Sequence, residues 1–452
     1  MLKIIPKKRS SVKSLISVTP KLPIRLAHTI TSQKVNTPEE CVKDIKSGDR
    51  LYLHSIAANP STLMKALKNR ANEFRNVEVY HIHLEGDVYH AHPDVKDSFW
   101  PNVGFIDKNT RKAVAEGRAT YTPCFLSEIP DLFRKNYIPI DWTFLNVSPP
   151  DEHGNIGATR AAFESSKHII AQINPNMPRS LGNSFIHLSK IEKYVEVDSK
   201  IPEFHPPKTT EITKQIAANI ASIVEDGATL QMGIGTLPDA VLANLTNHKD
   251  LGIHTELFAE GVIDLVAKGV INNSKKKFMP GRILATFVMG TQRMYQFIHN
   301  NPLIHMDDCA ITNDPRIISK NPKVTAINGA LEIDITGQAC ADSLGMKMYS
   351  GVGGQNDFIR GASLSERGKP IIALPSVTNK GKSRIVIGLS NGAGVVTSRN
   401  HIHYVATEYG IVNLHGKSLI QRAQLLISIA HPAHREELAK QASARFNYHF
   451  KV

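Results

Sequence analysis

The sequence predicts an α/β fold with two open α/β domains, each built on a largely parallel sheet flanked by helices. Three observations support this prediction. At 452 residues the chain is longer than one hydrophobic core usually organises. Short apolar runs alternate with amphipathic stretches, as in repeated β-α-β units. Finally, residues 202–208 hold three prolines and separate two such series, so we expect domains at 35–205 and 206–452.

The first series begins where Thr37-Pro38-Glu39-Glu40 presents a helix cap, a proline at the first helical position and a glutamate three residues after the cap. This pattern predicts that the folded body starts here. The remaining elements expected in this domain alternate in type. Strands are expected at 50–56, 77–83 and 142–147, and helices at 59–74 and 160–172.

The second series opens on a helix, because isoleucines recur at helical spacing at Ile212, Ile216, Ile220 and Ile223. A strand at 228–232 then runs into a glycine loop. The later apolar runs predict further strands at 283–288, 324–327, 371–374, 384–387 and 404–407. Helices beginning near Ser418 and His434 are expected to close the chain.

The net charge of +13 is concentrated at the N-terminus. Residues 1–34 carry eight Lys and Arg and no acidic residue, so taking these eight from +13 leaves +5 on the remainder. A basic, serine-rich, acid-free leader is typical of a mitochondrial transit peptide, although a disordered basic arm has the same composition. The remainder shows no basic block interleaved with aromatics, so no nucleic-acid partner is expected.

Other classes of protein lack support in the sequence. No apolar run approaches the roughly 20 residues that span a bilayer, so no membrane partner is expected. The four cysteines are widely spaced, and His305 with Asp307 or His401 with His403 falls short of a three-ligand metal site. We therefore expect no metal centre.

The strongest chemical candidate is the stretch 251–264, in which an apolar run leads into the carboxylate of Glu256. Two glycine loops bracket it, Gly233-Ile-Gly235 upstream and Gly351-Val-Gly-Gly354 downstream. Loop amides of this kind can receive an anion or a developing oxyanion. From the residues alone, both loops could equally be tight turns, and Glu256 could be a satisfied residue at the end of a strand.

Three long motifs sharpen this interpretation: Gly252-Ile-His-Thr-Glu-Leu-Phe258, Gly351-Val-Gly-Gly-Gln-Asn-Asp-Phe358 and Tyr404-Val-Ala-Thr-Glu-Tyr-Gly410. With them, the chain from about Val35 to its end resembles the acetyl-CoA hydrolase/transferase family. These are class I coenzyme A transferases, including 4-hydroxybutyrate and acetate:succinate CoA-transferases. The resemblance implies that Glu256 is a nucleophile that attacks an acyl-CoA thioester and ends as a glutamyl-CoA thioester, from which a second acid takes the CoA.

The same resemblance assigns roles to other residues. Catalytic roles fall to Glu256, Asn313, Gly354 and Glu408, with Asn313 and Gly354 as oxyanion donors and Glu408 as a second carboxylate near the nucleophile. Asn313 and Glu408 could instead be buried hydrogen-bonding residues. CoA contacts are implied for Gly233, Ile234, Gly235, Thr236, Leu237, Leu331, Gly353, Gly354 and Lys380.

The chain departs from the family pattern in its N-terminal domain. The segment from Asp151 to Arg160 is several residues shorter than usual, and the usual glycines are missing at 106–109. These departures bear on acyl preference and on turnover. We expect a mitochondrial matrix enzyme, a homodimer by resemblance, that moves CoA between acetyl-CoA and succinate. CoA is its substrate, and no tightly bound cofactor is expected. The alternatives are an acetyl-CoA hydrolase and a CoA-binding protein without turnover.

Overall fold

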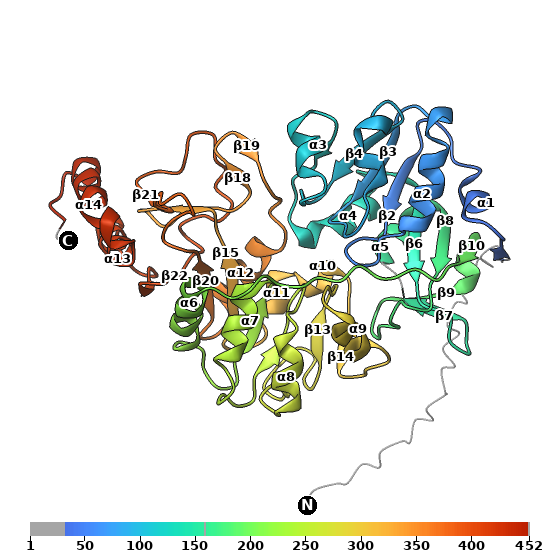
Figure 1. Cartoon of the computed structure of the whole chain (residues 1–452). Coiled ribbons are helices and arrows are strands. Elements are labelled where there is room, and N and C mark those ends of the chain that lie inside the picture. The colour runs from blue at the N-terminus through green and yellow to red at the C-terminus, as the bar shows by residue number, and fades with distance from the viewer. Residues whose placement is uncertain (1–31, 158–159, 451–452) are drawn as a thin grey trace, which may run out of the picture.

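The computed structural model describes residues 32–157 and 160–450, and it contains two large sheets, as predicted (Figure 1). Most of the predicted leader, residues 1–31, lies outside the described residues. Its last residues are described: β1 (Gln33–Lys34) pairs in parallel with β10 (Lys193–Glu196) at the edge of the first sheet. The folded body therefore begins slightly before residue 35.

The first sheet has eight strands in the order β1-β10-β8-β6-β2-β3-β4-β5, and every pairing in it is parallel. Its other strands are β2 (Arg50–Leu53), β3 (Val77–His81), β4 (Phe99–Val103), β5 (Thr120–Tyr121), β6 (Ile140–Val147) and β8 (Ser166–Ile173). Its helices are α1 (Pro38–Val42), α2 (Ser61–Asn69), α3 (Arg111–Ala115), α4 (Ile129–Arg134) and α5 (Arg160–Ser165). The predicted start of α1 is confirmed, since the Thr37 side chain accepts a hydrogen bond from the N–H of Glu40.

One predicted element of this domain is wrong. A single helix was expected at 160–172, but α5 ends at Ser165 and the chain continues directly as β8. Strand β8 lies between β6 and β10 and pairs in parallel with both. A strand buried in this way carries apolar residues on both faces, so Ile169-Ile170-Ala171 does not alternate and resembles a helix.

The second sheet has six strands in the order β12-β11-β15-β20-β22-β23, parallel except for the last pair. Its strands are β11 (Thr229–Met232), β12 (Gly252–Ile253), β15 (Thr325–Gly329), β20 (Lys369–Ala373), β22 (Tyr404–Thr407) and β23 (Gly410–Asn413). The helices of this half include α6 (Glu211–Ala221), α7 (Thr236–Ala243), α8 (Gly261–Ala267), α12 (Gln355–Leu364), α13 (Leu419–Ser428) and α14 (Pro432–Phe446).

Two predicted strands of this half lie outside the six-stranded sheet. The run at 384–387 contains β21 (Ile385–Val386), which joins a small sheet with β16 (Glu332–Asp334) and β17 (Ala339–Cys340). The run at 283–288 contains β13 (Ile283–Ala285), which pairs with β14 (Ile304–Met306). In the sequence, β13 and β14 follow β12, and β16 and β17 follow β15. The small sheets are therefore built largely from the chain that leaves the carboxyl ends of two large-sheet strands.

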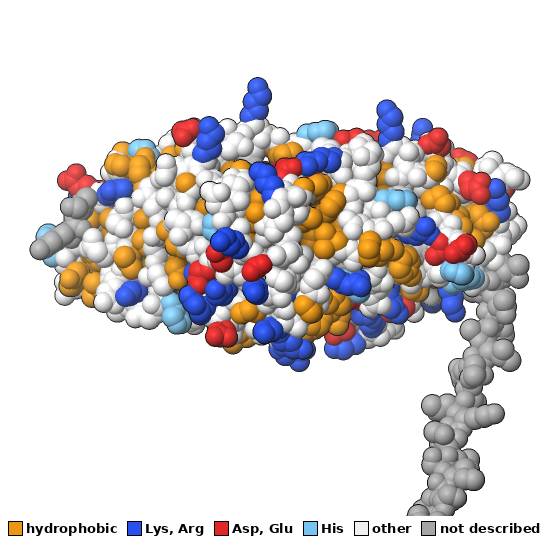
Figure 2. Space-filling model, turned by 90° about the horizontal axis from the view of Figure 1, so that it is seen from below, with side chains coloured by type: hydrophobic (Ala, Val, Ile, Leu, Met, Phe, Trp, Pro, Cys, Tyr) orange, Lys and Arg blue, Asp and Glu red, His pale blue; other side chains and the backbone are white. Residues whose placement is uncertain are grey.

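The two halves are in close contact. Ile56, Ala57 and Ile201 of the first half belong to the same hydrophobic core as the helices and strands that surround β11 and β12. Gly182 forms a β-bridge with Met306 of β14. Seen from below, the surface intersperses basic, acidic and hydrophobic side chains (Figure 2). Among the described residues, no helix is long and apolar enough to cross a membrane.

Candidate active site

Glu256 lies three residues beyond the end of β12, at the carboxyl edge of the second sheet. Its backbone is firmly held, because its carbonyl oxygen accepts hydrogen bonds from the N–H groups of Thr286 and Phe287, each at 3.0 Å. The preceding Thr255 hydroxyl donates to the carbonyl oxygens of Met232 and Leu257. These contacts with β11 and with the chain after β13 thus fix the backbone position from which the Glu256 side chain extends.

His254 connects this strand to the next part of the site. Its ring is buried, and Nε2 lies 2.7 Å from the carbonyl oxygen of Thr312, the last residue of α10 (Cys309–Thr312). Burial lowers the pKa of His254 to about 3, so the ring is neutral. Asn321 Nδ2 donates to the other ring nitrogen, which leaves Nε2–H to donate to Thr312. The ring therefore fixes the end of α10 against the strand that leads to Glu256.

Two of the predicted catalytic residues meet the Glu256 carboxylate. Asn313, fully buried at the end of α10, donates from Nδ2 to Glu256 Oε2 at 3.0 Å. Gly354 precedes α12 and is so close that a Cβ added there would lie 1.8 Å from Glu256 Oε2 and 2.3 Å from Asn313 Nδ2. Only glycine fits at this position. Asn313 and Gly354, which follow Glu256 in the sequence by 57 and 98 residues, thus form the immediate surroundings of its carboxylate.

The environment of Glu256 favours a partly protonated carboxyl group near neutral pH. Burial is the largest effect and raises its pKa from 4.5 to about 7. The hydrogen bond from Asn313 and the backbone N–H of Gly354 oppose this rise, while the negative charge of Asp357 adds to it. Perturbed carboxylates of this kind are characteristic of functional sites.

Asp357 is the residue that the sequence analysis missed. Its side chain is buried, and it accepts hydrogen bonds from the N–H of Ser127 at 3.1 Å and from the Ser127 hydroxyl at 2.8 Å. Asn313 Nδ2 lies 3.4 Å from its Oδ2. Burial raises the pKa of Asp357 to about 6. Its spacing in the sequence could have predicted this role. Asp357 follows Gly354 by three residues, so the two lie on the same side of the first turn of α12.

Glu408, the predicted second carboxylate, lies directly after β22. Its oxygens accept hydrogen bonds from the N–H of Ser376 at 2.9 Å and from the Ser376 hydroxyl at 2.5 Å. Strands β11, β15 and β20 lie between β12 and β22 in the sheet. The charge of Asp357 raises the Glu256 pKa, whereas the Glu408 oxygens are held by Ser376.

The predicted CoA loop lies beside the nucleophile. Residues 233–235 connect β11 to α7, Thr236 and Leu237 begin α7, and β11 is the direct neighbour of β12. Gly235 has a φ of +118°, a conformation that other residues rarely adopt, and it caps the N-terminus of α7. The unpaired N–H groups of this helix end are suited to an anion or a carbonyl oxygen.

The two remaining predicted CoA residues lie further along the same edge. Leu331 follows β15. Its N–H donates to the carbonyl oxygen of Cys340, and its own carbonyl oxygen accepts a hydrogen bond from the Arg384 guanidinium at 3.0 Å. Lys380 is exposed in the turn that closes between Thr378 and Lys382. Its ammonium group is free to reach a ligand at the surface, although no contact links it to Glu256.

The second glycine loop joins the two domains. Phe105 packs so closely that a Cβ added at Gly351 would lie 2.9 Å from its ring. Gly353 has a φ of +58°, and its carbonyl oxygen accepts from the N–H of Leu126 at 3.2 Å. The loop that brings Gly354 to the nucleophile is thus shaped by the N-terminal domain, next to the 106–109 segment that departs from the family pattern.

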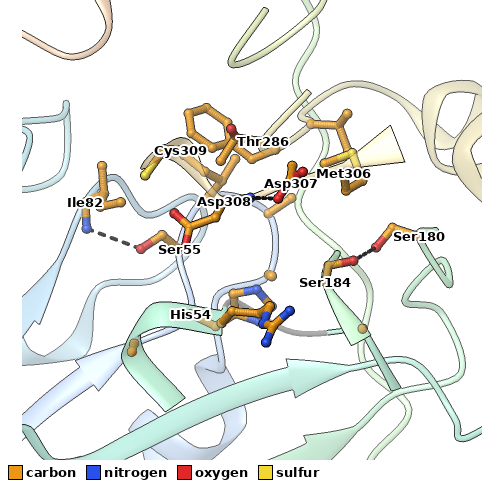
Figure 3. A pocket seen from close by; sticks show the side chains of 18 of the residues that line it. His54, Ser55, Ile82, Ser180, Ser184, Thr286, Met306, Asp307, Asp308 and Cys309 are labelled. Carbon is orange, nitrogen blue, oxygen red and sulfur yellow. Dashed lines mark hydrogen bonds between the residues drawn. The ribbon is translucent and has the colours of Figure 1, made fainter. Parts of the chain in front are cut away.

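A cavity of about 180 Å³ is lined by residues of both domains (Figure 3). Thr286 and Phe287, whose N–H groups hold the Glu256 carbonyl, form part of its wall. Most of the lining is apolar, and polar groups such as His54, Ser55 and Ser180 interrupt it. Arg160, the last residue of the shortened segment, also lines this cavity. The shortened segment therefore borders this cavity.

No group of three metal-ligating side chains is found within 32–157 and 160–450. The His305–Asp307 pair forms a hydrogen bond at 3.2 Å, with Asp307 also bound to Asn183. Glu256 presents a carboxylate of raised pKa, flanked by an amide and a backbone N–H, at the carboxyl edge of a parallel sheet, and such an arrangement is suited to covalent acyl transfer.

Comparison with known proteins agrees with this class. Residues 27–205 match the N-terminal domain of acetyl-CoA hydrolase/transferase, and residues 290–442 match its C-terminal domain. The chain therefore belongs to the acetyl-CoA hydrolase/transferase family.

Its relatives cover nearly the whole chain. A succinyl-CoA:acetate/propanoyl-CoA:succinate CoA transferase of Fasciola hepatica is 47% identical over 89% of this chain and 86% of the relative. The 4-hydroxybutyrate coenzyme A transferase of Clostridium kluyveri is 45% identical over 92% of this chain and 99% of the relative. The crystal structure of RipA from Yersinia pestis is 34% identical in sequence. It superimposes with a TM-score of 0.86 and covers 92% of this chain and 97% of the RipA chain.

Proposed function

We propose that the protein is a CoA-transferase that moves CoA from a short-chain acyl-CoA to a second carboxylic acid through a glutamyl-CoA thioester on Glu256. The observation that carries this proposal is the contact of Asn313 Nδ2 and Gly354 with a single buried carboxylate whose pKa is raised to about 7. The names of the relatives support acetyl, propanoyl, succinyl and 4-hydroxybutyryl groups as candidate acyl groups.

The reaction begins when ionised Glu256 attacks the thioester carbonyl carbon. The C–S bond breaks, CoA leaves as a thiolate, and a mixed anhydride joins the acyl group to Glu256. The thiolate then attacks the glutamyl carbonyl carbon, the C–O bond breaks, and the first acid leaves as a carboxylate. The second acid reverses these steps, so the energy of the thioester is retained.

The surrounding donors act on the oxyanions of this sequence. Each attack on a carbonyl carbon places negative charge on its oxygen, and prearranged N–H donors stabilise that charge. Asn313 Nδ2 and the Gly354 N–H already face the Glu256 oxygens, so they are in place for attack at the glutamyl carbonyl. Because both groups are held by buried elements, little reorganisation is needed during the reaction.

The cavity behind Thr286 and Phe287 is the proposed chamber for the carbon chain of the acid. Its mainly apolar wall suits a short chain, and its hydroxyl and imidazole groups can hydrogen-bond a polar end such as a second carboxylate or a hydroxyl. Acetate and succinate are the acids that we propose first. The shortened segment next to Arg160 supports a test of other acids as well.

Hydrolysis is the alternative reaction, because water entering this chamber would intercept the anhydride or the glutamyl thioester. The test is to incubate the protein with acetyl-CoA, with and without succinate, and to measure succinyl-CoA and free thiol. Transfer predicts succinyl-CoA and little thiol. Rapid thiol release without succinate would support a hydrolase, and binding of CoA without either product would contradict both reactions.

The cellular setting is also proposed rather than observed. The basic, acid-free composition of residues 1–34 supports import into the mitochondrial matrix. Fusing residues 1–34 to a reporter protein tests this directly, because a cytosolic reporter would contradict import. A homodimer, expected from the family, is tested by the mass of the purified protein in solution.

A further inference from the structure

A line of hydrogen bonds runs from the N-terminal domain to the nucleophile. Ser127 lies in the short helix η4 (Leu126–Glu128), and both its N–H and its hydroxyl donate to Asp357. Asp357 in turn lies 3.4 Å from Asn313 Nδ2, which donates to Glu256 at 3.0 Å. The first member of this line belongs to the first sheet's domain, and the other three surround the end of β12. The line therefore crosses the domain boundary.

The Asn313 amide lies at the centre of this line. A primary amide has two N–H bonds on nitrogen, so Nδ2 can face two carboxylates at once, whereas its oxygen only accepts. Here Nδ2 faces both Glu256 and Asp357, while Oδ1 is buried without a hydrogen-bond partner. Turning the amide over would place Oδ1 between two carboxylates. Asp357 thus disfavours the reversed amide, and Glu256 gains a donor instead of a second acceptor.

Resting on the proposed function, we propose that Asp357 is a positioning residue. It holds the Asn313 amide with Nδ2 toward Glu256, and Ser127 holds Asp357 from the opposite domain. The donor that faces the nucleophile is therefore fixed only while the two domains are in contact. A carboxylate suits this role, since the two Ser127 hydrogen bonds occupy both of its oxygens and it still accepts from Asn313.

The charged groups that act on Asp357 and on the Asn313 amide include Glu128 and Glu256. The pKa of Asp357 is raised mainly by burial and by Glu128, and lowered by the hydrogen bonds from Ser127 and Asn313. Glu256 is the other charge in contact with the amide, and the charge of Asp357 also raises the pKa of the Cys124 and Cys309 thiols. The hydrogen bonds from Ser127 and Asn313 therefore favour the ionised form of Asp357.

A purely structural contact between domains would be an alternative explanation, and a mutant cycle separates the two. The variants Asp357→Asn and Ser127→Ala are made in the wild-type protein and in Asn313→Ala. The rate of glutamyl-CoA formation is measured in a single turnover at pH 8, where Glu256 is largely ionised. We expect Asp357→Asn to slow this step by about 10- to 100-fold and to change KM for acyl-CoA less than about threefold.

The effect of Ser127→Ala should be smaller, about fivefold, because the Ser127 N–H remains, and Ser127→Thr should restore the rate. In the Asn313→Ala background, neither change should slow the step by more than about twofold, because both act through the amide. Equal losses in the two backgrounds, or a wild-type rate in Asp357→Asn, would overturn the inference.

Thr291→Ala is the matched control. Its hydroxyl donates to Glu260 at 2.7 Å within one domain, and its removal should lower stability without slowing glutamyl-CoA formation. The proposed function is judged separately, by whether the wild-type protein forms the Glu256 adduct. If it turns over without an adduct, that function is contradicted. The cycle is then read from overall turnover, where equal losses still overturn the role of Asp357.

Discussion

The pH dependence of the first chemical step follows from the burial of Glu256. Only the ionised carboxylate attacks the thioester, and burial raises its pKa from 4.5 to about 7. With that pKa, about one-tenth of the protein is reactive at pH 6 and about nine-tenths at pH 8. The rate of glutamyl-CoA formation at saturating acyl-CoA should therefore rise about tenfold between these two pH values.

The sign of the effect is fixed by the chemistry. A carboxylate with its ordinary pKa would be fully ionised at both values, and the profile between them would be flat. Asp357, whose pKa is raised to about 6, titrates in the same range, so the midpoint belongs to the pair of carboxylates.

The assay is a single turnover between pH 5.5 and 8.5, with the protein in excess and the adduct measured by mass. Asn313→Ala provides the control, because it removes the hydrogen bond that lowers the Glu256 pKa and should move the midpoint upward. A flat profile in the wild-type protein, or a rate that falls as the pH rises through 7, would refute this reasoning.

Three further predictions concern single substitutions. Glu256→Asp should reduce turnover by about 100-fold, because the shorter side chain withdraws the nucleophile by about a bond length, and steady-state kinetics with unchanged rates would contradict it. Gly354→Ala should reduce turnover at least as strongly, since the new Cβ would lie 1.8 Å from Glu256 Oε2. Gly388→Ala is the control and should remain active, because its Cβ would have no neighbour closer than 4.0 Å. Glu256→Gln should raise the free energy of unfolding relative to wild type by about 3 kcal/mol at pH 8 but by only about 1 kcal/mol at pH 5, because a raised carboxylate pKa makes the ionised form costly to bury. Denaturant unfolding at the two pH values measures that difference, and a gain that does not grow with pH would count against the raised pKa.

The fold was predictable from the sequence where local patterns and tertiary context agree. The start of α1 and the strand β22 were predicted at the residues where they occur, because a helix cap and a short apolar run are local signals. The error at 160–172 has a definite cause. The apolar run of β8 is buried between two neighbouring strands, so its sequence lacks the alternation that distinguishes a strand.

The site was predictable to the extent that its residues belong to recognisable motifs. Glu256, Asn313 and Gly354 come together although three separate segments supply them. Asp357 was within one of the quoted motifs, but only the structure shows that its side chain turns toward Asn313. Ser127 had no signal at all, because contacts between domains leave no local periodicity. The role of Glu408 as a second carboxylate near Glu256 stays a prediction, and the structure shows its oxygens accepting hydrogen bonds from Ser376.

The central claim is that Glu256 becomes covalently bonded to CoA. The most direct test is to incubate the protein with acetyl-CoA, reduce it with borohydride, digest it and measure the mass of the peptide that contains Glu256. We predict a CoA-bearing peptide before reduction and a peptide with Glu256 reduced to the alcohol afterwards, both absent in Glu256→Gln. An active protein whose Glu256 peptide keeps its unmodified mass throughout would contradict the account.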